Sequence, residues 1–100
     1  MSEEPSDQTN QRLHAIVHGH VQGVNFRSYT ARQAAALGLT GWIRNLPDGS
    51  VETVAEGPRE QLDKYKAYLH IGSPYAVVED VTATYKAATN QFDDFRVRFL

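Results

Sequence analysis

The sequence predicts an α+β domain in which two helices cover one face of a mostly antiparallel sheet. The expected element order is β-α-β-β-α-β, with a short extra strand at the C-terminal end. Leu13, Ala15 and Val17 alternate with His14, Ile16 and His18, which is the period of a strand, and apolar and polar residues alternate cleanly over Phe95–Phe99. Apolar residues recur at helical spacing over residues 26–37 and 62–69. Between these two segments, Asp48-Gly49 is a strong signal for a hairpin turn that joins two strands.

The first strand and the first helix lie on either side of a glycine-containing loop. One face of the strand should be the more buried one, and it carries Leu13, Ala15 and Val17. The helix is expected over Arg27–Leu37. The alanine run Ala34–Ala36 favours it, because alanine loses no side-chain entropy in a helix. Gly38 is the expected C-terminal stop.

The rest of the chain is predicted to form the remaining strands and a second helix. Gly57-Pro58 should end the third strand and place Pro58 at the first position of the helix, where the missing N–H of proline is not needed. This helix has a narrow apolar stripe and ends near Gly72, and polar residues 87–94 lead to the final strand. The expected strands are Gly41–Leu46, Val51–Glu56, Val77–Lys86 and Phe95–Phe99, and the stripe consists of Leu62, Tyr65 and Leu69.

Length, charge and cysteine content exclude several classes of protein. One hundred residues make a single domain, expected over residues 12–100, and the acidic, polar residues 1–11 should form a flexible tail. A net charge of −2 argues against a nucleic-acid-binding surface across the sheet. The absence of cysteine excludes disulfides and thiolate metal sites, and no apolar run approaches the roughly 20 residues of a membrane span. We therefore expect a cytoplasmic monomer that binds neither nucleic acid nor membrane.

The loop before the first helix is the strongest candidate for binding an anion. It consists of Gly19, His20, Val21, Gln22, Gly23 and Val24. Two glycines four residues apart permit positive φ angles, so the loop amides can converge on one point at the positive end of the helix dipole. Arg27 lies in the first turn, where its planar guanidinium can bind a phosphate through two hydrogen bonds. The alternative is an ordinary strand-to-helix turn followed by a surface arginine.

Two motifs in the sequence resemble those of the acylphosphatase family. The first is Val17-His18-Gly19-His20-Val21-Gln22-Gly23-Val24-Asn25-Phe26-Arg27, which is similar to the phosphate-binding loop of that family. The second combines Gly41-Trp42-Ile43-Arg44-Asn45 with Asp48-Gly49-Ser50-Val51. Both occur in the family's order. The resemblance continues through Gly57-Pro58 and Pro74-Tyr75-Ala76-Val77-Val78, and so covers nearly the whole chain after the tail.

The resemblance implies a ferredoxin-like fold and the hydrolysis of acyl phosphates to a carboxylate and inorganic phosphate, with no metal and no cofactor. It assigns phosphate binding to Arg27 and the loop from Gly19 to Val24, and the positioning of the attacking water to Asn45. Neither arginine nor asparagine titrates near neutral pH, so these residues can clamp charge and orient groups but cannot act as acid or base. The reaction tolerates this, because the leaving carboxylate has a solution pKa of about 4. Phosphoryl transfer depends mainly on positioning and charge stabilisation.

Other polar and aromatic side chains have simpler interpretations. Gln22 could donate its side-chain amide to the phosphate or point to solvent. Glu52 and Glu56 are interpreted as solvated charges on one strand face. Solvated surface histidines are more plausible than metal ligands at His14, His18 and His20, since no carboxylate or cysteine accompanies them in sequence. Core or sheet-face positions are expected for Trp42, Phe95 and Phe99.

Two further functions remain open. The first is a binding module that uses the glycine loop for an anion or the sheet face for RNA. Recognition of RNA on a sheet relies on exposed stacking aromatics on the central strands, and the first strand offers His14, Ile16 and His18 instead. The second is a domain that acts inside a larger carbamoyl-transfer assembly. The length of the chain, with no extra domain or zinc motif, favours a stand-alone enzyme.

Overall fold

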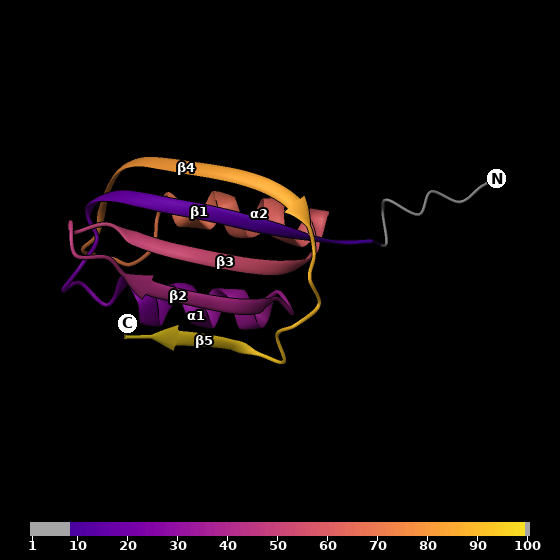
Figure 1. Ribbon diagram of the computed structural model, residues 1–100. Helices are drawn as coiled ribbons and strands as arrows, with labels where there is room; N and C mark the ends of the chain where they lie inside the picture. Colours follow the sequence, from indigo (N-terminus) through magenta and orange to yellow (C-terminus); the bar gives the residue numbers. More distant parts are fainter. Residues whose placement is uncertain (1–8, 100) are drawn as a thin grey trace.

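The computed structural model describes residues 9–99, which form five strands and two helices. The strands are β1 (Asn10–His20), β2 (Thr40–Asn45), β3 (Val51–Pro58), β4 (Val77–Ala87) and β5 (Phe95–Arg98), and the helices are α1 (Phe26–Ala36) and α2 (Arg59–Leu69). They build one sheet in the order β4-β1-β3-β2-β5, with both helices on the same face (Figure 1). The pair β2 and β5 is parallel, and the other neighbouring strands are antiparallel. The predicted ferredoxin-like α+β fold with an extra C-terminal strand is confirmed.

The core lies between the sheet and the two helices. Leu13, Ala15 and Val17 of β1 are fully buried, as their alternation predicts, and so is the whole predicted stripe of α2. Within the core, the hydroxyl of Tyr65 forms a 2.8 Å hydrogen bond with Oγ1 of Thr53, and burial raises the pKa of Tyr65 above its ordinary value. No helix in the described part of the chain is long and apolar enough to cross a membrane.

Three strands are longer than the sequence predicts, and β4 gains only Ala87. Asn10 and Gln11, assigned above to the tail, pair with Pro58 and Gly57 of β3 and so belong to β1. The rest of the predicted tail, residues 1–8, lies outside the described residues. Pro58 ends β3 and precedes α2 instead of opening it, because its φ of −62° and ψ of 143° suit an extended residue. The ladder with β1 therefore continues to the start of α2.

The prediction that Glu52 and Glu56 are solvated is wrong, most clearly for Glu56, which is only 2% exposed. Its carboxylate accepts hydrogen bonds from the backbone N–H and the hydroxyl of Thr89, at 2.8 and 2.9 Å, and from the N–H of Asn90 at 2.9 Å. Nε of Arg12 lies 3.5 Å from it. Glu52 lies 2.7 Å from both His14 and Arg44. The segment between β4 and β5 returns over the end of β3 and covers Glu56, which periodicity within β3 could not reveal.

Replacing Glu56 with glutamine should lower the free energy of unfolding at pH 7 by about 1–3 kcal/mol, since an amide cannot accept all of these hydrogen bonds. Burial raises the pKa of Glu56, but the hydrogen bonds from Thr89 and Asn90 outweigh it, so the pKa in the fold lies below its ordinary value of 4.5. Such a group stabilises the fold above its unfolded pKa and loses that contribution as the pH falls through the folded pKa. In urea unfolding, the free energy of unfolding should therefore fall less between pH 7 and pH 3 in Glu56→Gln than in wild type. Equal losses would contradict this.

Candidate active site

A cavity of about 300 Å³ opens where three segments meet at one end of the sheet. These segments are the loop between β1 and α1, the end of β2 and the end of β5, which lie together at the left of Figure 1. Arg27 and Asn45 both face this cavity, although 17 intervening residues separate them in the sequence. The cavity is lined by Val21, Gly23, Asn25, Phe26, Arg27, Ser28, Asn45, Val97 and Phe99.

The backbone of the loop turns sharply at three residues with positive φ. Gly19 has a φ of 132°, Gly23 of 76° and Asn25 of 63°. Gly19 and Gly23 thus adopt the positive φ angles that the sequence predicts for them. Asn25 immediately precedes α1 and makes no side-chain hydrogen bond to it, and the first turn of α1 contains no acidic residue. The first N–H groups of a helix have no partner within it, so this uncapped end offers donors and positive potential to the cavity.

Three side-chain hydrogen bonds hold the loop in place. Nε2 of Gln22 donates to the carbonyl oxygens of Leu46 and Ser50, at 2.8 and 2.9 Å. Oγ of Ser73 donates to the carbonyl oxygen of Val24 at 2.7 Å. Gln22 therefore neither faces the cavity nor points freely to solvent, which were the two alternatives from the sequence. It fastens the loop to the turn between β2 and β3, and so fixes the loop relative to Asn45.

That turn is itself ordered by Asp48. Its Oδ1 accepts hydrogen bonds from the N–H of Ser50 at 2.9 Å and from the hydroxyl of Ser50 at 2.5 Å. These bonds lower the pKa of Asp48 below its ordinary value. The structural role expected for the Asp48-Gly49 turn agrees with this geometry. The same turn presents the carbonyl of Ser50 to Gln22.

Arg27 is held by the C-terminal end of the described chain. Its Nη1 donates to the carbonyl oxygen of Arg98 at 2.9 Å, and its guanidinium carbon lies 4.8 Å from the centre of the Phe99 ring. Phe99 is 78% exposed, so its expected place in the core or on a sheet face is wrong, and it covers Arg27 instead. The sequence contained no signal for these two contacts, because they depend on the parallel pairing of β5 with β2.

Asn45 ends β2 and shares a sheet face with buried Ile43, whereas Arg44 projects from the other face to Glu52. This is the alternation expected for neighbouring strand residues. Oδ1 of Asn45 is shielded from solvent and has no hydrogen-bond partner within residues 9–99. An unsatisfied buried acceptor costs about 1–3 kcal/mol. The oxygen is therefore available for a donor that enters the cavity.

Of the six loop residues predicted to bind phosphate, Val21 and Gly23 line the cavity. Gly19 belongs to β1, next to an irregularity in its pairing with β4, and the other three loop residues do not line the cavity. Their roles toward phosphate stay predictions. Within residues 9–99, no three His, Asp or Glu side chains gather in a way that could hold a metal ion. Among the described residues that line the cavity, Arg27 alone has a charged side chain.

Replacing Gly19 with alanine should destabilise the protein by about 3 kcal/mol or more, because the new Cβ would collide with the backbone of Val77 and Glu79 at a φ that disfavours any side chain. Gly23→Ala is the matched control. It also requires positive φ, but its Cβ would meet nothing within 4 Å, so about 1 kcal/mol is expected. Urea unfolding of both variants measures the difference. Equal losses would show that contact with β4 does not constrain the loop.

Comparisons with known proteins identify the family. Residues 13–97 match the family model described as acylphosphatase. The chain is 51% identical over 88 residues to an acylphosphatase of Marinobacter nauticus, covering 88% of this chain and 96% of that protein. An acylphosphatase structure from Coxiella burnetii is 37% identical with a TM-score of 0.85, covering 98% of this chain and 100% of that one. One from Bacillus subtilis is 34% identical with a TM-score of 0.85, covering 88% and 98%. By sequence and by fold, the chain belongs to the acylphosphatase family of hydrolases.

Proposed function

We propose that the protein hydrolyses the carboxyl-phosphate anhydride bond of acyl phosphates without a metal ion or cofactor. In this proposal Arg27 and the amides of the loop Gly19–Val24 bind the phosphate, and Asn45 positions the attacking water. The protein acts as a monomer on a small-molecule substrate, in the cytoplasm, and inorganic phosphate occupies the same loop as product.

The observation that carries the proposal is the meeting of Arg27 and Asn45 in one cavity, at the uncapped end of α1. A cation and helix N–H groups together favour a phosphate at this place. The unpartnered Oδ1 of Asn45 is an acceptor for a proton of a bound water. The cavity therefore offers a binding place for the phosphate and an orienting group for the nucleophile.

The chemical step follows from these positions. The water oxygen forms a bond to phosphorus while the bond from phosphorus to the acyl oxygen breaks, and its electron pair leaves with the carboxylate. One water proton passes to an oxygen of the phosphate itself. Arg27 and the amides stabilise the negative charge on the phosphate oxygens, which dominates catalysis of phosphoryl transfer.

A side-chain acid is not required, because the leaving carboxylate has a solution pKa of about 4. The described residues that line the cavity include no Asp, Glu, His, Lys or Tyr, so they offer no side-chain acid to the leaving group. A phosphate ester with a phenol leaving group, of pKa about 10, would lack the proton that its departure needs. The proposed site should therefore discriminate strongly between these two kinds of substrate.

Steady-state kinetics in excess chelator test the proposal, with benzoyl phosphate and phenyl phosphate as matched substrates. We expect turnover of benzoyl phosphate to be unaffected by the chelator, and kcat/KM for phenyl phosphate to be lower by at least about 10³. Inorganic phosphate should inhibit competitively. Failure to hydrolyse benzoyl phosphate, with phosphate still bound at the loop, would leave an anion-binding module and overturn the catalytic assignment.

A further inference from the structure

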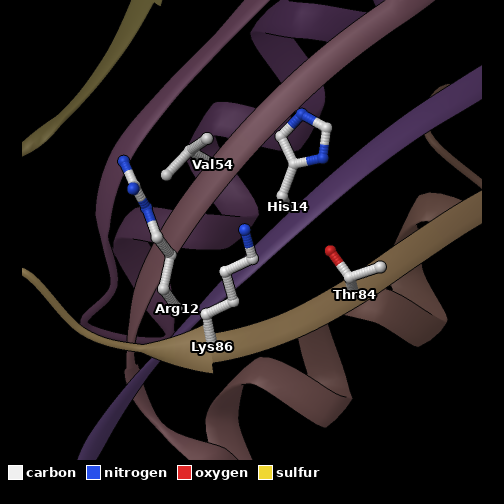
Figure 2. Close-up of a pocket in the computed structure, with 5 residues that line it drawn as sticks. All are labelled: Arg12, His14, Val54, Thr84 and Lys86. Carbon is white, nitrogen blue, oxygen red and sulfur yellow. The ribbon is translucent and has the colours of Figure 1, made fainter.

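The sheet face opposite the helices carries a second and slightly larger cavity, of about 360 Å³. We call it the sheet-face cavity, and it is lined by Arg12, His14, Val54, Thr84 and Lys86. Figure 2 shows Arg12, His14, Thr84 and Lys86 projecting from neighbouring strands, with Val54 between Arg12 and His14. None of these residues lines the cavity that contains Arg27 and Asn45. The proposed hydrolysis makes no use of them.

Positive charge accumulates at this cavity without full compensation. Arg12 and Lys86 are direct partners across β1 and β4, and His14 is the next residue of β1 on the same face. Like charges placed directly opposite each other across two strands repel. Within residues 9–99, no carboxylate lies at ion-pair distance from Lys86. The protein as a whole has a net charge of −2, so this concentration of cations is local.

The neighbouring carboxylates are already engaged by other donors. Glu56 accepts its hydrogen bonds from Thr89 and Asn90, and its contact with Nε of Arg12 is a 3.5 Å ion pair without a hydrogen bond. Glu52 is shared between His14 and Arg44.

Among the described residues that line the sheet-face cavity, Arg12 and Lys86 are fully charged and none is a carboxylate. Glu56 pairs with Arg12, which leaves the charge of Lys86 uncompensated. Within residues 9–99 neither Arg12 nor Lys86 donates a side-chain hydrogen bond, and the guanidinium carbon of Arg12 lies 5.7 Å from the centre of the Phe92 ring. An anion that enters the cavity can therefore contact donors of both side chains.

The chemistry of the lining matches a phosphate group. Arg12 and Lys86 can both donate charge-assisted hydrogen bonds to a phosphate, and the hydroxyl of Thr84 supplies a further donor. Val54, which is 4% exposed, offers an apolar surface for the organic part of the ligand. A single-stranded nucleic acid fits less well. Arg44 and Arg98 lie over the ring of Trp42, at 5.2 and 4.9 Å, where a stacking base would have to lie.

We propose that the sheet-face cavity binds the phosphate group of a small phosphate ester between Arg12 and Lys86. The site lies on the opposite side of the sheet from the proposed active site. It requires no catalytic activity, and its existence does not depend on the hydrolase proposal.

Phosphate binding can be followed by the shifts of backbone amide NMR signals in the full-length protein. The Arg27→Ala variant is used as background, so that the site on the helix side is weakened. Inorganic phosphate, phenyl phosphate, chloride and a short uridine oligonucleotide are titrated separately at constant ionic strength. Lys86→Gln tests the proposed site, and Lys64→Gln, an exposed lysine of α2, is the matched control.

Saturable shifts at residues 12, 14, 84 and 86 with both phosphate compounds are expected, unchanged in Lys64→Gln and at least about tenfold weaker in Lys86→Gln. The proposal is overturned if the shifts are confined to residues 19–28, or if chloride reproduces them. It also falls if Lys86→Gln binds as tightly as its parent, or if only the oligonucleotide binds. If the wild-type protein does not hydrolyse benzoyl phosphate, the proposed function fails, but phosphate binding at the sheet-face cavity is unaffected by that outcome.

Discussion

Replacing Arg27 with alanine should lower kcat for benzoyl phosphate by about 10²–10³ and raise KM at least about tenfold. The guanidinium carries a full positive charge at every accessible pH and lines the cavity beside the loop. It therefore pairs with the phosphate of the bound substrate and also with the larger charge that its oxygens carry in the transition state. The first interaction appears in KM and in inhibition by inorganic phosphate, and the second appears in kcat. Steady-state kinetics with phosphate as inhibitor measure both effects.

Arg32→Ala is the control for this experiment. Arg32 lies on the same helix and over the ring of Tyr29, away from the cavity, so its loss should leave both constants within about twofold of wild type. Arg27→Lys keeps the charge but loses the planar pair of donors. Compared with Arg27→Ala, it should therefore show a smaller rise in KM but nearly the same loss of kcat. Equal activity of Arg27→Ala and Arg32→Ala would show that Arg27 is an ordinary surface arginine.

The parts of the fold that sequence periodicity could predict are those in which each residue's environment follows from its own element. Leu62, Tyr65 and Leu69 repeat at helical spacing, and they are buried because a helix has one face toward the sheet. Gly38 takes a φ of 74° just after α1, as expected for a helix stop. Glu56 could not be placed in this way. Its burial depends on Thr89 and Asn90, more than 30 residues further along the chain.

The same distinction applies to the proposed site. Arg27 and Asn45 could be singled out because each lies in a local motif that resembles a known family, and the structure places both at one cavity. The carbonyl of Arg98 that holds Arg27 belongs to no motif, since that contact arises only when β5 pairs with β2. Gln22 lies inside a motif, yet its side chain bonds to the turn between β2 and β3. A sequence motif can therefore identify a functional residue, but it does not reveal which group that residue's side chain contacts.

Replacing Asn45 with alanine should lower kcat by about 10²–10³ and change KM by no more than about threefold. The proposed role of Asn45 is to orient the water, which does not contribute to substrate binding. Because neither Asn45 nor any other described lining residue titrates near neutral pH, wild-type kcat should be flat from about pH 6 to 9. A pronounced bell-shaped profile would indicate an acid or base that the proposal lacks. Asn10→Ala, at the exposed start of β1, is the control and should retain full activity.

The free energy of unfolding of Asn45→Ala distinguishes a catalytic role of Asn45 from a structural one. Oδ1 of Asn45 is buried without a partner in the described chain, so removing it relieves a cost of about 1–3 kcal/mol that the fold bears in the absence of substrate. The loss of side-chain packing offsets part of this gain, and the free energy of unfolding should therefore stay equal to wild type or rise. A residue that merely supported the end of β2 would behave in the opposite way, with lower stability and unchanged kcat. An inactive variant that unfolds at the same or higher urea concentration would show that Asn45 is kept for the reaction, at the expense of stability.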